Sequence, residues 1–221
     1  MKKKSILMAA IAVMLVAVLV VGGTLAYFTD TKSATNTFTV GDVKIKLDES
    51  NVNDPDGDRV TSNEYTGMLP GIQYKKDPVV TNTGKNGAYV RAVVTIENGM
   101  NWMGLYNENV WTAPQAEAFK KLICNKMGEG WSLEDYNYVT NAERGSTDFV
   151  AVLKYDGVLA AGKATTAMFE NIMLPTNATA SDITTRVAQN GVFHIDVVAQ
   201  AIQADGFTSW NDAFKAFDAQ K

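Results

Sequence analysis

The feature that most constrains the fold is a repeated alternation of apolar and polar residues with a period of two. In the run GAYVRAVVTIEN, residues 87–98, the apolar residues Val90, Ala92, Val94 and Ile96 occupy every second position. Successive side chains of a β-strand point to opposite faces, so one face of this run is expected to pack on a core. The pattern predicts a strand.

Further runs have the same strand-like pattern, and turn residues separate them. In the last of them Phe193, Ile195, Val197, Ala199 and Ala201 share one face. Many short strands with turns between them favour an antiparallel sandwich or barrel. These runs are residues 37–48, with a phase shift at Gly41-Asp42 that indicates a bend or bulge, 75–84, 147–157, 163–174 and 191–203.

Two or three short helices are predicted among the strands. Residues 113–128 carry Pro114 near the start and Gly128 at the end, the usual helix start and stop signals. Residues 181–191 begin at Ser181, an N-cap residue type, and residues 208–221 place four apolar side chains on one helical face. The chain is therefore predicted to be mainly β, with two or three short helices.

The N-terminus has the layout of an export signal. Lys2, Lys3 and Lys4 precede an uncharged apolar run of 16 residues, 6–21, and Gly22, Gly23 and Thr24 end it. This order predicts a signal peptide, residues 1–26, cut after Ala26 or, alternatively, after Tyr27. Extended through Ala26, the run also approaches the ~20 residues of a spanning helix, so an uncleaved anchor is the alternative. Either way the rest of the chain is expected to leave the cytoplasm.

Charge and cysteine content limit the partners and the disulfides that this chain can have. Residues 27–221 hold 17 basic and 24 acidic residues, a net charge of −7. An acidic surface without a basic patch predicts no nucleic-acid partner, and a membrane contact only through the leader. Cys124 is the one cysteine, so no disulfide can form within a chain, and we expect it in the core on the apolar face of a helix.

The sequence contains no recognisable catalytic set. His194 is the one histidine, and it is expected to face outward from its strand. A hydrolase triad or a zinc site with several imidazoles cannot be built around it alone, and no phosphate-binding or metalloprotease motif is present. The chain is therefore predicted not to be an enzyme.

The acidic loop of residues 49–64 is the one metal candidate. Asp54, Asp56 and Asp58 are spaced so that their oxygens could converge on Ca²⁺. The fit to an EF-hand loop is poor, because Arg59 stands where that loop needs glycine and Tyr65 where it needs glutamate. A low-affinity Ca²⁺ site and a solvated acidic turn both remain open, and no other cofactor is predicted.

The segment after the leader is suited to an extended conformation. Residues 27–40 carry five threonines and no proline, so every backbone N–H can join a β-ladder. Phe28 and Phe38 provide apolar anchors, each worth ~1.5–3 kcal/mol when buried. The segment is predicted to be a strand that pairs either with another molecule or with its own chain, and the sequence leaves the two open.

Two stretches resemble the TasA/CalY (camelysin) family. The leader end and early strand match through Gly22-Gly23-Thr24, Ala26, Phe28, Asp30, Thr37-Phe38, Gly41, Val43 and Ile45. MLPGIQYKKDPVVTNTG, residues 68–84, is similar to the family's Leu-Pro-Gly…Lys-Asp…Asn-x-Gly segment. The resemblance implies a jelly-roll-like antiparallel β-sandwich, cleavage by a SipW-type signal peptidase, and secretion to the matrix or surface of a Gram-positive bacterium.

The resemblance also implies a function. Family members polymerise into biofilm-matrix fibres, so the predicted partner is another copy of the chain, joined through a strand-exchange segment containing Phe28, Asp30, Thr37, Phe38 and Val40. Camelysin is also described as a metal-dependent protease. The predicted organisation is a signal peptide (1–26), a possible donor strand (27–47) and a β-sandwich domain (48–221). A monomeric surface adhesin or Ca²⁺-binding module of the same fold is the alternative function.

Overall fold

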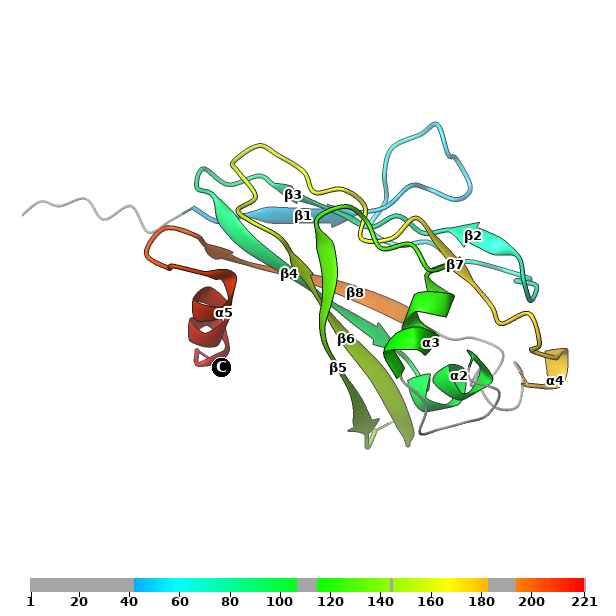
Figure 1. Ribbon diagram of the computed structural model, residues 1–221. Coiled ribbons are helices and arrows are strands. Elements are labelled where there is room, and N and C mark those ends of the chain that lie inside the picture. The colour runs from blue at the N-terminus through cyan, green and yellow to red at the C-terminus, as the bar shows by residue number, and fades with distance from the viewer. Residues whose placement is uncertain (1–41, 107–114, 144, 183–193, 221) are drawn as a thin grey trace, which may run out of the picture. The chain divides into compact units, whose positions relative to one another are not determined.

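The computed structural model describes residues 42–106, 115–143, 145–182 and 194–220 (Figure 1). The chain divides into two compact units, residues 1–40 and 41–221, and every described residue belongs to the second. The leader and residues 27–40 therefore lie outside the described residues, and their predicted structure stays a prediction.

The described unit is mainly β with antiparallel sheets, as predicted, and it is consistent with a β-sandwich. A four-stranded sheet has the order β5-β6-β4-β8, and two-stranded sheets pair β1 with β3 and β2 with β7. The strands are β1 (Ile45–Asp48), β2 (Gln73–Lys75), β3 (Val79–Asn82), β4 (Ala88–Ile96), β5 (Trp131–Asn141), β6 (Ser146–Tyr155), β7 (Asn171–Met173) and β8 (Ile195–Gln203).

Strand β4 carries the centre of the core. Its even-numbered side chains are at most 1% exposed, and they face the same way as the buried Phe149, Ala151 and Leu153 of β6. On the other side of this core lie the small sheets and their loops, with Val80 and Ile172 buried against it (Figure 1). The period-two pattern thus identifies the buried face correctly, including Ile195, Val197, Ala199 and Ala201 of β8.

The segment of residues 68–84, which carries part of the sequence resemblance, has a packing role. The Asn82 side chain is fully buried, and its Nδ2 donates to the carbonyl oxygens of Asn86 and Leu159 at 2.8 and 3.0 Å. Gly84 lies so close to the strand start that a Cβ there would be 2.1 Å from the carbonyl oxygen of Asp42. Only glycine allows this approach, so the motif joins the loop after β3 to the entry of β1.

The helices in the described ranges are α2 (Gly99–Tyr106), α3 (Gln115–Leu122), α4 (Ala180–Asp182) and α5 (Trp210–Asp218). Helices α3 and α5 fall within the predicted segments 113–128 and 208–221. Most of the predicted helix of residues 181–191 lies outside the described residues. Helix α2 was not predicted, because its sequence GMNWMGLY has no regular polar face. None of the helices in these ranges has the length and hydropathy of a membrane span.

The placement predicted for Cys124 needs correction. The residue follows the end of α3 in a turn with φ 57°, rather than lying on the helix itself, and it is only partly buried. Burial raises the pKa of its thiol. The fully buried neighbour is Ile123, at 1% exposure. The helix ends earlier than the apolar pattern indicates, because the backbone turns left-handed at Cys124 and Asn125.

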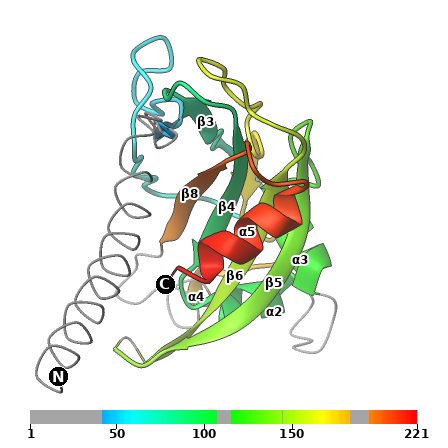
Figure 2. The ribbon, with the colours of Figure 1, turned by 90° about the vertical axis from the view of Figure 1, so that its left-hand side faces the viewer.

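Helix α5 covers part of the outer face of the four-stranded sheet (Figure 2). Arg91 of β4 points outward, pairs with Asp218 of α5 at 2.5 Å, and lies 4.4 Å from the ring of Phe214. The Trp210 ring nitrogen donates to the carbonyl oxygen of Val90 at 2.9 Å. The predicted apolar face of residues 208–221 therefore packs against its own sheet.

Adjacent residues of β6 test the two faces of the sheet. We expect Leu153→Ala to lower the free energy of unfolding by about 2–5 kcal/mol, because Leu153 is fully buried. Val152→Ala, on the opposite and less buried face, is expected to cost clearly less. Urea unfolding of both variants measures the difference, and equal losses would contradict this assignment of faces.

Candidate functional site: an open strand edge beside a cleft

The four-stranded sheet ends at β8, and within the described ranges β8 pairs only with β4. The amide of Glu97 donates to the carbonyl oxygen of His194 at 3.0 Å, and that of Ala204 donates to Gly87 at 2.9 Å. Hydrogen-bonded pairs alternate along an antiparallel ladder, so the even-numbered residues of β8 bond to β4. The backbone groups of Ile195, Val197, Ala199 and Ala201 therefore face away from β4.

A cleft of about 1060 Å³ lies beside the first half of this edge. Its walls come from the end of β1, from residues 61–68 and from residues 195–198 of β8. Several of its lining side chains are apolar and are shared with the core. These are Leu47, Met68, Ile172, Leu174, Ile195 and Val197.

A buried ion pair lines the cleft. Lys76 Nζ lies 2.9 Å from Glu49 Oε2, and the two side chains are 9% and 6% exposed. A buried charge needs a close partner of opposite sign, so each of these residues depends on the other. The Lys76 ammonium also lies 6.0 Å from the ring centre of Tyr65.

Tyr65 fixes the neighbouring wall. Its hydroxyl donates to the carbonyl oxygen of Lys75 at 2.6 Å, and its ring meets that of Tyr74 edge to face. Burial, together with the charges of Glu49 and Asp77, raises the pKa of Tyr65 well above its ordinary value. Tyr65 therefore stays a neutral hydrogen-bond donor in this wall.

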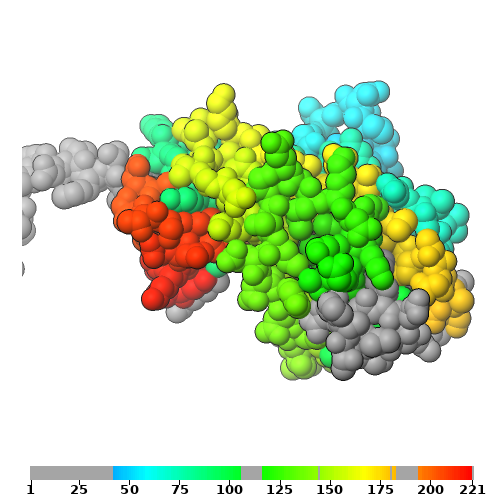
Figure 3. All heavy atoms as spheres, in the orientation of Figure 1, coloured from blue at the N-terminus to red at the C-terminus, as the bar shows by residue number. Residues whose placement is uncertain are grey.

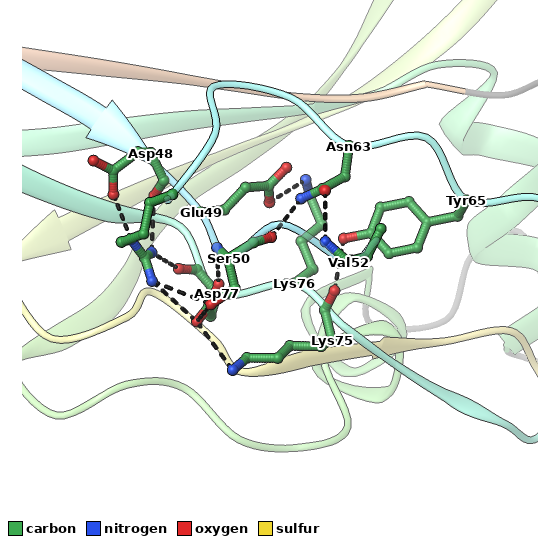
Figure 4. Close-up of polar contacts among 10 residues, drawn as sticks. Asp48, Glu49, Ser50, Val52, Asn63, Tyr65, Lys75, Lys76 and Asp77 are labelled. Atoms are coloured by element: carbon green, nitrogen blue, oxygen red, sulfur yellow. Dashed lines mark hydrogen bonds and ion pairs between the residues drawn. The ribbon is translucent and has the colours of Figure 1, made fainter. Parts of the chain in front are cut away.

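Arg59 connects the long loop after β1 to the sheet. Its partners Asp48, Ser50 and Asp77 are shown in Figure 4. Its Nε donates to Asp48 Oδ1 at 2.5 Å, and its two terminal nitrogens donate to the backbone carbonyls of Asp48 and Asp77 and to Asp77 Oδ2. Ser50 adds bonds from its amide and hydroxyl to the two carboxylate oxygens of Asp77, at 2.7 and 2.8 Å. The loop that forms one wall of the cleft is thus held by charge-assisted hydrogen bonds.

These bonds shift the titration of both carboxylates. Burial alone would raise the pKa of Asp48, but hydrogen bonds from Arg59 and Lys46 outweigh it and hold the pKa below its ordinary value. Burial opposes ionisation of Asp77 in the same way, and the bonds from Ser50 and the charge of Arg59 outweigh it, so its pKa is also lowered. Both groups are therefore carboxylates at neutral pH.

The sequence-predicted site residues fall into two groups. Those of the leader end and the strand-exchange segment lie outside the described residues: Ala26, Tyr27, Phe28, Asp30, Thr37, Phe38 and Val40. Asp54, Asp56 and Asp58 are exposed in the loop that Arg59 ties down, with a turn closed by the bond from the Gly57 amide to the Asp54 carbonyl oxygen. Calcium binding there stays a prediction.

His194 lies at the rim of the cleft, where β8 begins. Its side chain is 63% exposed, and Nε2 lies 3.8 Å from Glu97 Oε2. The predicted outward orientation is confirmed. Across the ranges that the structure covers, no group of three or more His, Cys, Asp or Glu side chains is arranged to hold a metal ion.

The charged residues of the cleft wall were not predicted as a site. Glu49 and Lys76 line the cleft, and Arg59 and Asp77 hold the loop that forms its wall. They come from residues 49–59 and 76–77, and neither stretch carries a recognisable motif. One signal in the sequence could have indicated these pairs. Lys76 and Asp77 lie just before the apolar strand β3, and charged residues that become buried beside a strand need partners of opposite charge.

The comparison with protein families finds a match for the first part of the chain. Residues 1–84 match the family described as camelysin metallo-endopeptidase. No curated protein and no solved structure matches the chain. The matched range covers the predicted leader, the predicted strand-exchange segment, β1, β2 and β3, which are the parts that carry the resemblance noted in the sequence. The family description implies a catalytic metal, but the described residues do not offer a ligand set that fits one.

Removing one partner of the buried ion pair tests the cleft wall. We expect Lys76→Met to lower the free energy of unfolding by about 3–5 kcal/mol, because it leaves the Glu49 carboxylate buried without a counter-charge. The double variant Glu49→Leu/Lys76→Met is expected to be less destabilised than the single one. Chemical denaturation compares them, and a double variant at least as unstable as the single would contradict the pairing.

Acid is expected to weaken the same wall. Asp48 and Asp77 have folded-state pKa values below their ordinary value of 3.8, so their stabilisation is complete above about that pH and is lost as the pH falls through the lowered values. The melting temperature should therefore drop below about pH 4. Arg59→Gln should lower stability at pH 7 and flatten this acid dependence. An unchanged acid dependence would show that Arg59 is not the cause.

Proposed function

We propose that this chain, which belongs to the camelysin (TasA/CalY) family by its first 84 residues, is a structural subunit of extracellular biofilm-matrix fibres. Membership supports a secreted biofilm-matrix protein at the level of the family. The finer proposal is that copies of the chain assemble head to tail, each inserting its N-terminal strand segment into the next.

The observation that carries the proposal is the open edge of β8. Its outward backbone groups are those of Ile195, Val197, Ala199 and Ala201, and the cleft beside it provides apolar surface. An extended segment added to such an edge gains affinity from backbone hydrogen bonds and specificity from side chains that enter pockets. Both requirements are met along the same stretch of β8.

Residues 27–40 have the properties of the segment that would fill this edge. At about 3.3 Å per residue they extend over roughly 45 Å, more than the nine residues of β8 need. Phe28, Phe38 and Val40 supply apolar side chains for the cleft, whereas Asp30 and Thr37 keep the segment polar before assembly. The segment directly precedes the described unit in the sequence.

The geometry of assembly follows from the two ends of the contact. The donor is the N-terminal segment and the acceptor is β8, so the contact joins two different surfaces. In a row of subunits, one donor segment stays unused at one end and one β8 edge at the other. Repeating a head-to-tail contact gives a filament when the rotation does not close. Pairing of the segment with β8 of its own chain is the alternative, and it would give a self-complete monomer.

Export would control when assembly begins. The leader keeps residues 27–40 attached to a membrane segment until a SipW-type signal peptidase cuts near Ala26 or Tyr27. The net charge of −7 for residues 27–221 then disfavours non-specific association of the released chain. This order places fibre growth outside the cell.

A second candidate function is secreted proteolysis, which the family description favours. The chain has one histidine, exposed His194, so a catalytic zinc would need mostly carboxylate or cysteine ligands. A protease assay on casein with and without a chelator tests this candidate. A monomeric adhesin or Ca²⁺-binding module is tested by microscopy and by calorimetry with CaCl₂.

Deleting residues 27–38 tests the fibre proposal. We expect residues 27–221 to form filaments visible by negative-stain microscopy, and the shortened chain to remain folded without forming them. If the shortened chain forms filaments as readily, strand exchange by this segment is wrong. If neither chain forms filaments, the monomeric alternative is favoured.

A proline on the acceptor edge gives a matched test. Val197→Pro removes an outward N–H while keeping the bonds of β8 to β4, since Val197 faces away from β4. Filament formation should be lost with the circular dichroism spectrum retained. Asp196→Ala, on the neighbouring residue, is the control that should keep filament formation.

A further inference from the structure

The other end of the four-stranded sheet is β5, which pairs only with β6 in the described part of the chain. Figure 2 shows β5 and β8 at opposite ends of the sheet, and in Figure 3 the green side chains of the β5 region lie on the face toward the viewer. A sheet with two open ends offers two places for another strand to add. If subunits are to assemble with a single polarity, one of these two edges must be blocked against strand addition.

The second half of β5 would be a favourable template for pairing. Its sequence YNYVTN, residues 136–141, contains no charged residue, no glycine and no proline. Tyr136 and Val139 are 39% and 47% exposed, although the Tyr136 ring stacks on the buried Phe149. Exposed uncharged strands with these residue types are typical sites of unwanted strand addition.

Two backbone N–H groups of this stretch are already engaged by side chains. The amide of Tyr136 donates to Asp135 Oδ1, and that of Tyr138 donates to Asn137 Oδ1, each at 2.8 Å. The two amides are two residues apart, so they point to the same side of the strand. Since the bonds to β6 use the alternate residues, this side is the free edge.

The first half of β5 is protected in a different way. The register against β6 shifts between Leu133 and Asp135, which marks a bulge. Glu134 and Asp135 are exposed acidic residues at that point. Bulges and charges both disfavour the addition of another strand, so the engaged amides extend the protection to the uncharged half.

We propose that the side chains of Asp135 and Asn137 close the β5 edge by occupying the N–H groups that a second copy would need. The excluded partner is β5 of a sister molecule, lying antiparallel across a two-fold axis. The role of β8 as the accepting edge rests on the proposed function. The closure of β5 does not rest on it. Asp135 and Asn137 thus determine which edge of the sheet takes part in assembly.

The test compares three variants of residues 27–221. Asp135→Ala/Asn137→Ala removes both side-chain acceptors without introducing a strong strand former. Asp135→Asn/Asn137→Asp exchanges the two residues, which keeps both acceptor oxygens and the same net charge. Glu134→Ala removes one negative charge from the same strand without removing an acceptor. Melting temperatures establish that each variant is folded.

Aggregation is followed by sedimentation and thioflavin T fluorescence at equal concentration. The double alanine variant is expected to aggregate several-fold faster than the unmodified chain, and microscopy should show sideways association. The exchanged variant and Glu134→Ala should behave like the unmodified chain. A folded double alanine variant that aggregates no faster would overturn the proposal, and so would an exchanged variant that aggregates equally fast.

Amide hydrogen exchange on the unmodified chain provides a measurement that needs no variant. The amides of Tyr136 and Tyr138 should exchange more slowly than that of Thr140, the next residue on the same side. Equal exchange of the three would contradict the closure. Sideways association through β5 does not need residues 27–40. A chain that forms no filaments would therefore count against the proposed function, and the comparison of the β5 variants would still test the closure of β5.

Discussion

A β-strand carries hydrogen-bonding groups along both of its edges, and a sheet must pair, cover or block those at its two ends. In this chain the constraint acts on β5 and β8, the end strands of the four-stranded sheet. At β5, side chains of Asp135 and Asn137 occupy outward amides. At β8, the outward groups lie beside an apolar-lined cleft. The proposed polarity of assembly follows from this difference between the two ends.

The cleft depends on charged residues that would be costly to bury alone. Lys76 and Glu49 neutralise each other inside its wall, and Arg59 joins Asp48 and Asp77 through five donated bonds that also involve Ser50. Buried ion pairs often contribute little net free energy compared with apolar residues in the same place. The directional bonds of these charged residues nevertheless hold the loop of residues 49–65 in one position, which keeps the cleft open beside β8.

Sequence patterns identified the elements that are buried on one face only. Strands β4, β6 and β8 and helix α5 were predicted because their apolar residues recur at the period of the element. Helix α2 and strand β5 were missed for opposite reasons. Helix α2 is apolar on most sides, with Trp102, Met103 and Leu105 all buried. Strand β5 is mostly exposed, and the bulge between Leu133 and Asp135 shifts the phase of its apolar residues.

The sequence by itself determined the strand pattern and the match of residues 1–84 to the camelysin family model, because both depend on residues close together in the chain. For the same reason it predicts an export signal and an extended segment at residues 27–40. Only the tertiary structure decided which strands end the sheet, and that Glu49 meets Lys76 and Arg59 meets Asp77. Strand order and ion pairing join residues far apart in the chain, and several orders can bury the same apolar faces. The pairing that satisfies the backbone and the buried charges together is therefore a property of the folded molecule.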